Sequence, residues 1–368
     1  MSDATVTVGV PVYRGQDFLA EALETVQAQT YRDIRVLISI DGPDPVCEQV
    51  VRPFLRDPRF VLTTRQNRRG WVGNLNWLMR NTDTAYWCYQ QQDDLLDADY
   101  LAVLVDHLRA TPDAAVAYCD IQAFGQADWR IEQDSLTGHP VTRQLTLLHE
   151  HLAAVAFRGV TRTEALHRMG RLPANPVENF AVDTVWMAAM AGAGELHRVP
   201  GYRYRKRYHD GNIHTKWPTW PAPRRHRAWA THCADMLHQA LLVPATTVQE
   251  RRLLWGGAVA RLTHPRLAAG YASAAELGPV ERAALLATFT GRVRAHRPAI
   301  ETELDMTAHE LSWWTADLYR AEGDVRPDRL RGELTARVAP VVLGCARAAR
   351  VRLRIGRSRH RRDAGPDS

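Results

Sequence analysis

The chain has 368 residues, of which 45% are hydrophobic, so it can bury a full core in one large domain or in two. No apolar run approaches the roughly 20 residues of a membrane helix, and the N-terminus lacks the basic start of a signal peptide. The net charge of +6 is concentrated between Arg347 and Arg362, where eight arginines occur without an acid; the rest is close to neutral, which excludes a uniformly basic nucleic-acid-binding surface.

The first 120 residues alternate strand and helix patterns, the order expected of a mainly parallel α/β sheet. Strands are predicted at residues 5–12, 35–40, 60–64, 86–89 and 115–119, and helices at residues 16–28, 46–55, 71–79 and 97–110. Residues 125–207 mix helices with short strands, including a buried helix at 181–190 and a strand at 201–208. Prolines mark a boundary at 218–222, after which the pattern is helical to about residue 355.

Polar features follow three predicted strands, at Tyr13, at Asp41 and at the run from Gln91 to Asp94. In open α/β sheets ligands bind at the carboxyl ends of the strands, and an acid after the second strand can accept hydrogen bonds from a ribose or a base. The turn after the first strand lacks the GxGxxG pattern, which argues against a nicotinamide dinucleotide site.

The adjacent carboxylates Asp93 and Asp94 have two interpretations. One carboxylate at a strand end can hold a divalent cation that neutralises a diphosphate. Acids also favour the first turn of a helix, and the pair taken alone fits that second interpretation better.

The order of the motifs resembles that of family 2 glycosyltransferases of the GT-A fold. Residues 6–42 contain a strand that ends in Pro-x-Tyr, a helix with a Gln-Thr-Tyr segment, and a second strand that ends in an acid, as in that family. Residues 66–76 are similar to its Asn-x-Gly…Asn stretch, and residues 86–96 stand where the family has an Asp-x-Asp motif. Residues 178–212 resemble its acceptor half, so the resemblance covers about residues 4–215.

The resemblance implies a GT-A domain over residues 1–217, with a donor half at about 1–120 and an acceptor half at 121–217. A helical region at 218–350 and a basic, disordered tail at 351–368 would follow. Donor-binding roles are implied for Pro11, Val12, Tyr13, Asp41, Asn67, Gly70, Asn76, Gln91, Asp93, Asp94, Arg205 and Arg207.

The implied metal site holds Mg²⁺ or Mn²⁺ through Asp93, with His209 as a second ligand that suits Mn²⁺ better. Gln91 stands where the family has its first Asp, and a neutral amide adds no charge, so cation affinity is expected to be weaker than in a two-acid site. Asp94 is expected to serve the sugar or to cap the next helix. A structural role remains open for His209.

Asp183 falls where the family places its catalytic base, which takes the proton from the acceptor hydroxyl as that oxygen attacks the anomeric carbon and inverts it. Glu178 is the substitute candidate, and helix N-terminal polarity is the alternative explanation of Asp183.

The predicted function is therefore an inverting, metal-dependent transfer of a sugar from a UDP- or TDP-sugar to a hydroxyl of a glycan, a lipid-linked acceptor or a natural product. The alternatives are a non-catalytic GT-A-like module that binds sugar nucleotides or acts as a scaffold, and an NDP-sugar nucleotidyltransferase. A nucleotidyltransferase should carry a Gly-rich, Lys-containing phosphate loop near the start of the chain, and this sequence has no such loop.

The scattered, odd-numbered cysteines favour reduced thiols in a cytoplasm, without a disulfide framework or a structural zinc site. The arginines between Arg347 and Arg362 are expected either to remain solvated or to contact the inner face of an anionic membrane peripherally. The oligomeric state is not predicted.

Overall fold

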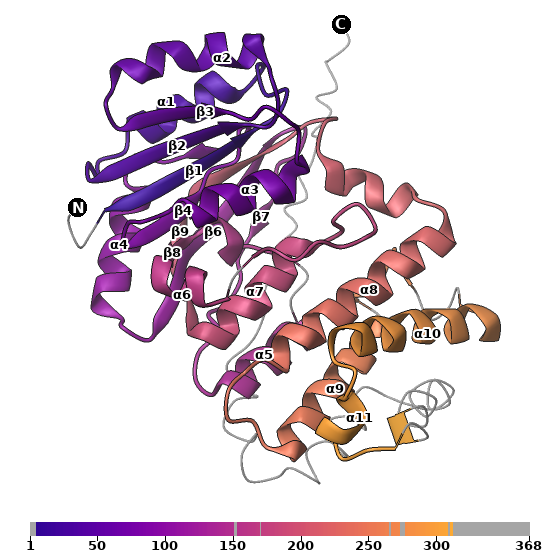
Figure 1. The fold of residues 1–368 in the computed structure, drawn as a ribbon. Coiled ribbons are helices and arrows are strands. Elements are labelled where there is room, and N and C mark those ends of the chain that lie inside the picture. The colour runs from indigo at the N-terminus through magenta and orange to yellow at the C-terminus, as the bar shows by residue number, and fades with distance from the viewer. Residues whose placement is uncertain are drawn as a thin grey trace, which may run out of the picture.

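The computed structural model describes residues 5–150, 153–169, 171–264, 266–272, 277–307 and 310–311. A sheet flanked by helices forms the N-terminal part, and helices α8 to α11 lie beyond α5 and α7 at one side of it (Figure 1). The arginines between Arg347 and Arg362 and the proposed membrane contact fall outside the described residues.

A mixed sheet of nine strands crosses the described N-terminal part in the order β3-β2-β1-β4-β8-β6-β9-β5, with β7 paired to β6. Its strands are β1 (Val6–Val12), β2 (Ile34–Ile40), β3 (Phe60–Thr64), β4 (Tyr86–Tyr89), β5 (Leu95–Leu96), β6 (Ala114–Gly125), β7 (Arg130–Ile131), β8 (Val160–Arg162) and β9 (Glu195–Tyr208). Strands β3, β2, β1 and β4 are parallel to one another, and β9 is parallel to β6. The predicted α/β class with mostly parallel strands is confirmed.

The helices bury apolar faces at the expected spacing. They are α1 (Leu19–Gln27), α2 (Pro45–Val51), α3 (Gly70–Arg80), α4 (Tyr100–Ala110), α5 (Pro140–Glu150), α6 (Thr163–Met169), α7 (Val182–Ala193), α8 (Ala222–Ala240), α9 (Val248–Leu262), α10 (Pro279–His296) and α11 (Ile300–Glu303). The helix predicted at 46–55 instead ends as a 3-10 turn, Arg52–Arg56, because Pro53 has no backbone N–H to continue the α-helical hydrogen bonds.

The helical region shares one buried core with the sheet domain. Helix α8 packs on α7 and α10, and α9 packs on α5. The predicted boundary falls between the 3-10 helix Ile213–Thr219 and the start of α8, next to Pro218 and Pro221, and stays a prediction. No helix in the described part of the chain is both long and apolar enough to cross a bilayer.

Candidate active site

The run of three glutamines that follows β4 is held by hydrogen bonds that need amides. Gln90 is fully buried and donates to the carbonyl oxygens of Gln91 and Asp94, at 2.8 and 2.7 Å. Gln92 accepts from the backbone N–H of Tyr13 at 2.8 Å and donates to the Tyr13 carbonyl at 3.1 Å. A carboxylate has no proton to donate in these contacts, so two of the glutamines are explained by the shape of the turn.

Gln91 is the neutral partner of a buried cation. Oriented to satisfy both groups, its amide oxygen accepts from Nη2 and Nε of Arg158 at 2.9 and 3.1 Å. Arg158 also donates to the Ala154 carbonyl at 3.0 Å, and its Nε lies 4.0 Å from Oδ2 of Asp94. The position where the resemblance implies a first metal-binding acid is thus turned toward a guanidinium.

Asp94 binds strand β9 through both carboxylate oxygens. Its side chain is 1% exposed; Oδ2 accepts from the Tyr204 hydroxyl at 2.6 Å, and Oδ1 accepts from the backbone N–H of Arg207 at 2.8 Å. Burial, followed by the charge of Asp93, raises the pKa of Asp94 to about 6. Asp94 does not cap the next helix, which begins at Tyr100.

The predicted metal pair is brought together. Asp93 is 15% exposed, and its Oδ2 lies 2.9 Å from Nε2 of His209. Asn212 Nδ2 lies 3.4 Å from the same oxygen. The backbone N–H of Gly211 donates to Nδ1 of His209 at 3.2 Å, which places the ring proton on Nε2 and makes His209 the donor to Asp93.

No group of three or more His, Cys, Asp or Glu side chains with metal-binding geometry occurs among the described residues. A carboxylate oxygen from Asp93 nevertheless suits a cation that takes most of its ligands from substrate phosphates and water. Nε2 of His209 would become a second ligand by giving up the proton that it donates to Asp93. The residues present therefore fit a weakly held Mn²⁺ or Mg²⁺.

The ends of β1 and β2 form a polar rim beside the glutamine run. Tyr13 is 37% exposed, and the Arg68 guanidinium lies 4.0 Å from its ring centroid. Asp41 is buried and accepts from the backbone N–H of Arg69 at 2.8 Å. These side chains offer an aromatic face, a cation and a carboxylate at the carboxyl edge of the sheet.

The remaining predicted donor residues are less favourably placed. Pro11–Val12 is buried within β1, Asn67 is exposed, and Gly70 opens α3 with φ 71°. Asn76 is buried, and its side-chain amide binds the backbone of Leu172: Nδ2 donates to the carbonyl oxygen at 3.0 Å, and Oδ1 accepts from the N–H at 2.7 Å. The donor-binding prediction for Asn76 gains no support, because its geometry fixes a loop to α3.

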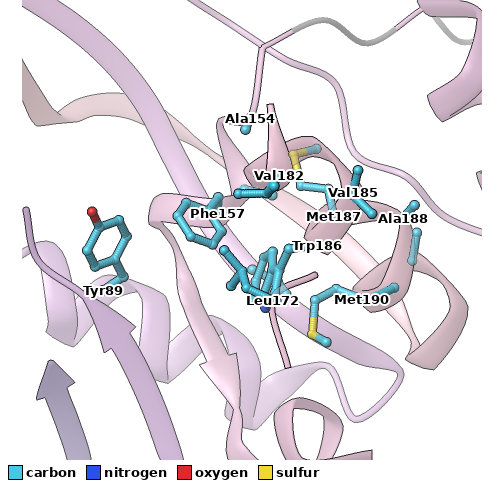
Figure 2. Close-up of a cluster of buried hydrophobic side chains, with 14 of the residues drawn as sticks. Tyr89, Ala154, Phe157, Leu172, Val182, Val185, Trp186, Met187, Ala188 and Met190 are labelled. Carbon is cyan, nitrogen blue, oxygen red and sulfur yellow. The ribbon is translucent and has the colours of Figure 1, made fainter. Parts of the chain in front are cut away.

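Asp183 is the only charged residue of α7, a helix that is otherwise buried from Val182 to Ala191. Figure 2 shows the apolar face of this helix, including Trp186, packed against Phe157. Asp183 is only partly buried and interacts electrostatically with Arg158 and Lys206. The acid predicted as catalytic base therefore shares a site with the charges around Asp94.

Glu178 is turned away from that site. Its side chain is 63% exposed and forms an ion pair with Arg224. Glu178, Asn179 and Ala181 all have positive φ, at 51°, 55° and 48°, although none is glycine. Such strain costs roughly 1–3 kcal/mol per residue and is typical of functional sites. It lies immediately before Asp183, the better placed of the two candidate bases.

Strand β9 separates its basic residues by alternation. Arg205 lies against the Phe124 ring at 5.1 Å, and Arg207 lies against the same ring at 4.4 Å while donating to the Asp93 carbonyl at 2.9 Å. Lys206, between them, points to the other face, where its Nζ lies 4.9 Å from the Tyr208 ring centroid. Burial, followed by the charge of Arg158, lowers the pKa of Lys206 to about 8.

Lys206 and Arg158 belong to this site but were not among the residues predicted from the sequence. Period-two alternation along the predicted strand at 201–208 was a usable signal for Lys206, since it separates the lysine from Arg205 and Arg207. Arg158 lies in the 3-10 turn Ala156–Arg158 and follows no motif, so only tertiary structure reveals it.

A surface pocket lies at the opposite edge of the sheet. Asp83, Thr84, Arg162, Glu164 and His167 are among its lining residues, next to the first residue of β4. It does not include any of the site residues described above.

Comparisons with known proteins find similarity to the same family over part of the sheet domain. Residues 7–170 match the model of the family described as Glycosyl transferase family 2. A segment of 102 residues is 26% identical to Glycosyltransferase GlyA of Streptococcus pneumoniae, covering 28% of this chain and 15% of GlyA. A segment of 118 residues is 32% identical to protein y4gI of Sinorhizobium fredii, covering 31% of this chain and 13% of that protein. The chain thus matches only a small part of each curated relative's length.

Among solved structures, residues 1–349 of TarS from S. aureus, in complex with UDP-GlcNAc, have a similar fold. The TM-score is 0.63 at 11% identity, and the match covers 86% of this chain and 90% of that one. The likeness confirms the predicted GT-A fold.

Proposed function

We propose that this chain, whose residues 7–170 match the model of Glycosyl transferase family 2, moves a sugar from a nucleoside-diphosphate sugar to an acceptor hydroxyl. The observation that supports this most is the contact of 2.9 Å between Asp93 and His209, at the edge that also carries Asp183. Together these residues supply a place for a diphosphate and a base for an acceptor.

The proposed reaction is a single displacement. Asp183 takes the proton from the acceptor hydroxyl as its oxygen forms a bond to the anomeric carbon. The bond from that carbon to the diphosphate oxygen breaks on the opposite side, so the configuration inverts and the electron pair leaves with the nucleoside diphosphate. Asp183 is partly buried and interacts electrostatically with two nearby cations, Arg158 and Lys206.

Asp93 and His209 would hold Mn²⁺ or Mg²⁺, whose charge offsets the diphosphate when bound. Tyr13, Asp41 and Arg68 form the rim proposed to take the nucleotide. The TarS domain of similar fold was crystallised with UDP-GlcNAc, so UDP-sugars are the first donors to test.

The test is transfer or donor hydrolysis by the full chain in the presence of Mn²⁺. We expect activity that EDTA abolishes and that Asp93→Ala and Asp183→Asn each lower by at least about 100-fold. Thermal shifts with UDP-, TDP- and GDP-sugars identify the nucleotide, because a bound donor stabilises the fold by mass action. Full activity in both variants would overturn the site assignment.

The contact between Gln91 and Arg158 favours one second candidate, a module that binds sugar nucleotides without turnover. Donor binding without transfer or hydrolysis, over a panel of glycan, lipid-linked and small-molecule acceptors, would support that candidate.

Contact of the basic tail with an anionic membrane, and a location at its inner face, remain proposals. Deletion of residues 338–368 tests the contact by recovery of the protein in the membrane fraction.

A further inference from the structure

Lys206 presents an ammonium group that the described part of the chain leaves without a hydrogen bond or an ion pair. Its nearest described partner is the ring of Tyr208, at 4.9 Å from Nζ to the centroid. It is one of only two lysines in a chain with 45 arginines. A half-buried ammonium with no described carboxylate in contact is costly, so this position favours an external anion.

The acids around Lys206 are already committed. Asp94 gives both of its oxygens to β9 and lies 4.0 Å from Arg158, and Asp93 is bonded to His209. Oδ1 of Asp183 accepts the backbone N–H of Thr184 at 3.0 Å. These acids attract the ammonium at longer range, whereas Arg158 repels it.

The surroundings therefore combine two cations on one face of β9 with acids that are held by other groups. Arg158 is fixed behind the site by Gln91 and by the Ala154 carbonyl. Lys206 carries a compact charge on a flexible stem and can turn its three donors toward a ligand. The flanking arginines Arg205 and Arg207 cannot do this, because they lie on the other face against Phe124.

We propose that Lys206, with Arg158 behind it, forms an anion subsite that binds an anionic oxygen of the donor. That oxygen belongs to the β-phosphate or to a carboxylate on the transferred sugar. The inference rests on the proposed function, since it places the donor between Asp93 and Asp183. On the β-phosphate, the ammonium stabilises the negative charge that grows as the bond to the anomeric carbon breaks.

The test compares ligand affinities of the full chain by calorimetry with Mn²⁺ present. The probes are UMP, UDP, UDP-glucose and UDP-glucuronate, with TDP and GDP replacing UDP if wild type binds either of them better. Lys206→Met removes the charge, Lys206→Arg keeps it, and Lys216→Met is the matched control, because Lys216 is exposed in the 3-10 helix Ile213–Thr219.

We expect Lys206→Met to lose at least about tenfold in affinity for UDP with little change for UMP, as the loss of a charge-assisted contact predicts. Lys206→Arg should retain part of the affinity, and Lys216→Met should match wild type. If the sugar carboxylate is the anion, Lys206→Met keeps its UDP affinity and loses only the preference for UDP-glucuronate over UDP-glucose. Either pattern supports the subsite.

The subsite is overturned if Lys206→Met, with a wild-type melting temperature, binds every probe as wild type does. If Lys206→Met does not fold, Lys206→Gln is measured against the same criterion. A wild-type chain that binds none of UDP, TDP and GDP overturns the proposed function together with the subsite. Wild-type binding that Lys206 variants leave unchanged removes the subsite alone.

Discussion

The hydroxyl of Tyr204 donates to the carboxylate of Asp94 at 2.6 Å, across 110 residues of sequence. The same carboxylate accepts from the backbone of Arg207, so the end of β9 is fixed against the turn after β4. His209 follows two residues later and reaches Asp93. The buried acid thus sets the register between the two halves of the proposed metal site.

Tyr204→Phe removes one hydrogen bond to a buried carboxylate and should lower the free energy of unfolding by about 1.5–3 kcal/mol. Urea unfolding measures the loss. Tyr208→Phe is the control on the same face of β9, since its hydroxyl has no hydrogen bond among the described residues. An equal loss in both variants would show that the contact with Asp94 contributes nothing specific.

Gln91→Asp restores the acid that the family resemblance implies, but it places the new carboxylate beside Arg158. The guanidinium competes for that carboxylate, so Mn²⁺ affinity should rise by less than about tenfold. The electron paramagnetic resonance signal of free Mn²⁺ measures the affinity. A gain near 100-fold would mean that the new acid turns from Arg158 to the metal.

The two candidate catalytic bases, Asp183 and Glu178, can be distinguished by how much their substitution lowers kcat. Asp183→Asn should lower kcat by about 10²–10⁴, the usual contribution of a general base. Glu178→Gln should leave kcat within about threefold, because its exposed side chain pairs with Arg224. Initial rates of nucleoside-diphosphate release measure both, and the opposite ranking would assign the base to Glu178.

His149 makes the fold sensitive to acid. Burial, followed by the charges of His264 and Arg261, lowers its pKa to about 4. The unfolded chain then binds the proton more readily than the folded one. The contribution of the neutral His149 side chain to the free energy of unfolding is therefore fully present above pH ~6.5 and is lost as the pH drops toward 4. The loss should be on the order of 2–3 kcal/mol at pH 4.

Urea unfolding at several pH values tests this dependence. His149→Gln should reduce the slope without abolishing it, because burial also lowers the pKa of His214 and of His238 to about 4. His167→Gln, at an exposed position, should leave the slope unchanged. An unchanged slope in His149→Gln would assign the effect to other groups.

The strained loop before Asp183 packs against side chains of the helical region. Phe180 packs against Trp217 and Tyr271, at centroid distances of 4.6 and 5.0 Å, and lies 5.9 Å from His232. A chain ended after Trp220 loses the last two partners and should bind a hydrophobic dye and lose near-ultraviolet dichroism. A cooperative, dye-free transition in that truncated chain would instead make the sheet domain self-sufficient.

Strand and helix periodicity predicted the α/β fold, because long regular elements carry clear patterns. Short β5, β7 and β8 have two or three residues and no usable period. The structure brings Asp93 and His209, both named from the motif order, within 2.9 Å and places Asp183 near the same charges, while their roles stay predictions. The motif order did not reveal that Asn76 is bonded to Leu172, or that a buried arginine faces Gln91, since both depend on segments 67–96 residues apart in sequence.

The two hydrogen bonds between Gln92 and the backbone of Tyr13 have a practical consequence. The Tyr13 amide proton is protected by a side chain and not by a neighbouring strand, so its exchange with solvent follows the state of the glutamine turn. In an NMR spectrum that single resonance would report loosening of the turn on ligand binding, without any label in the site itself.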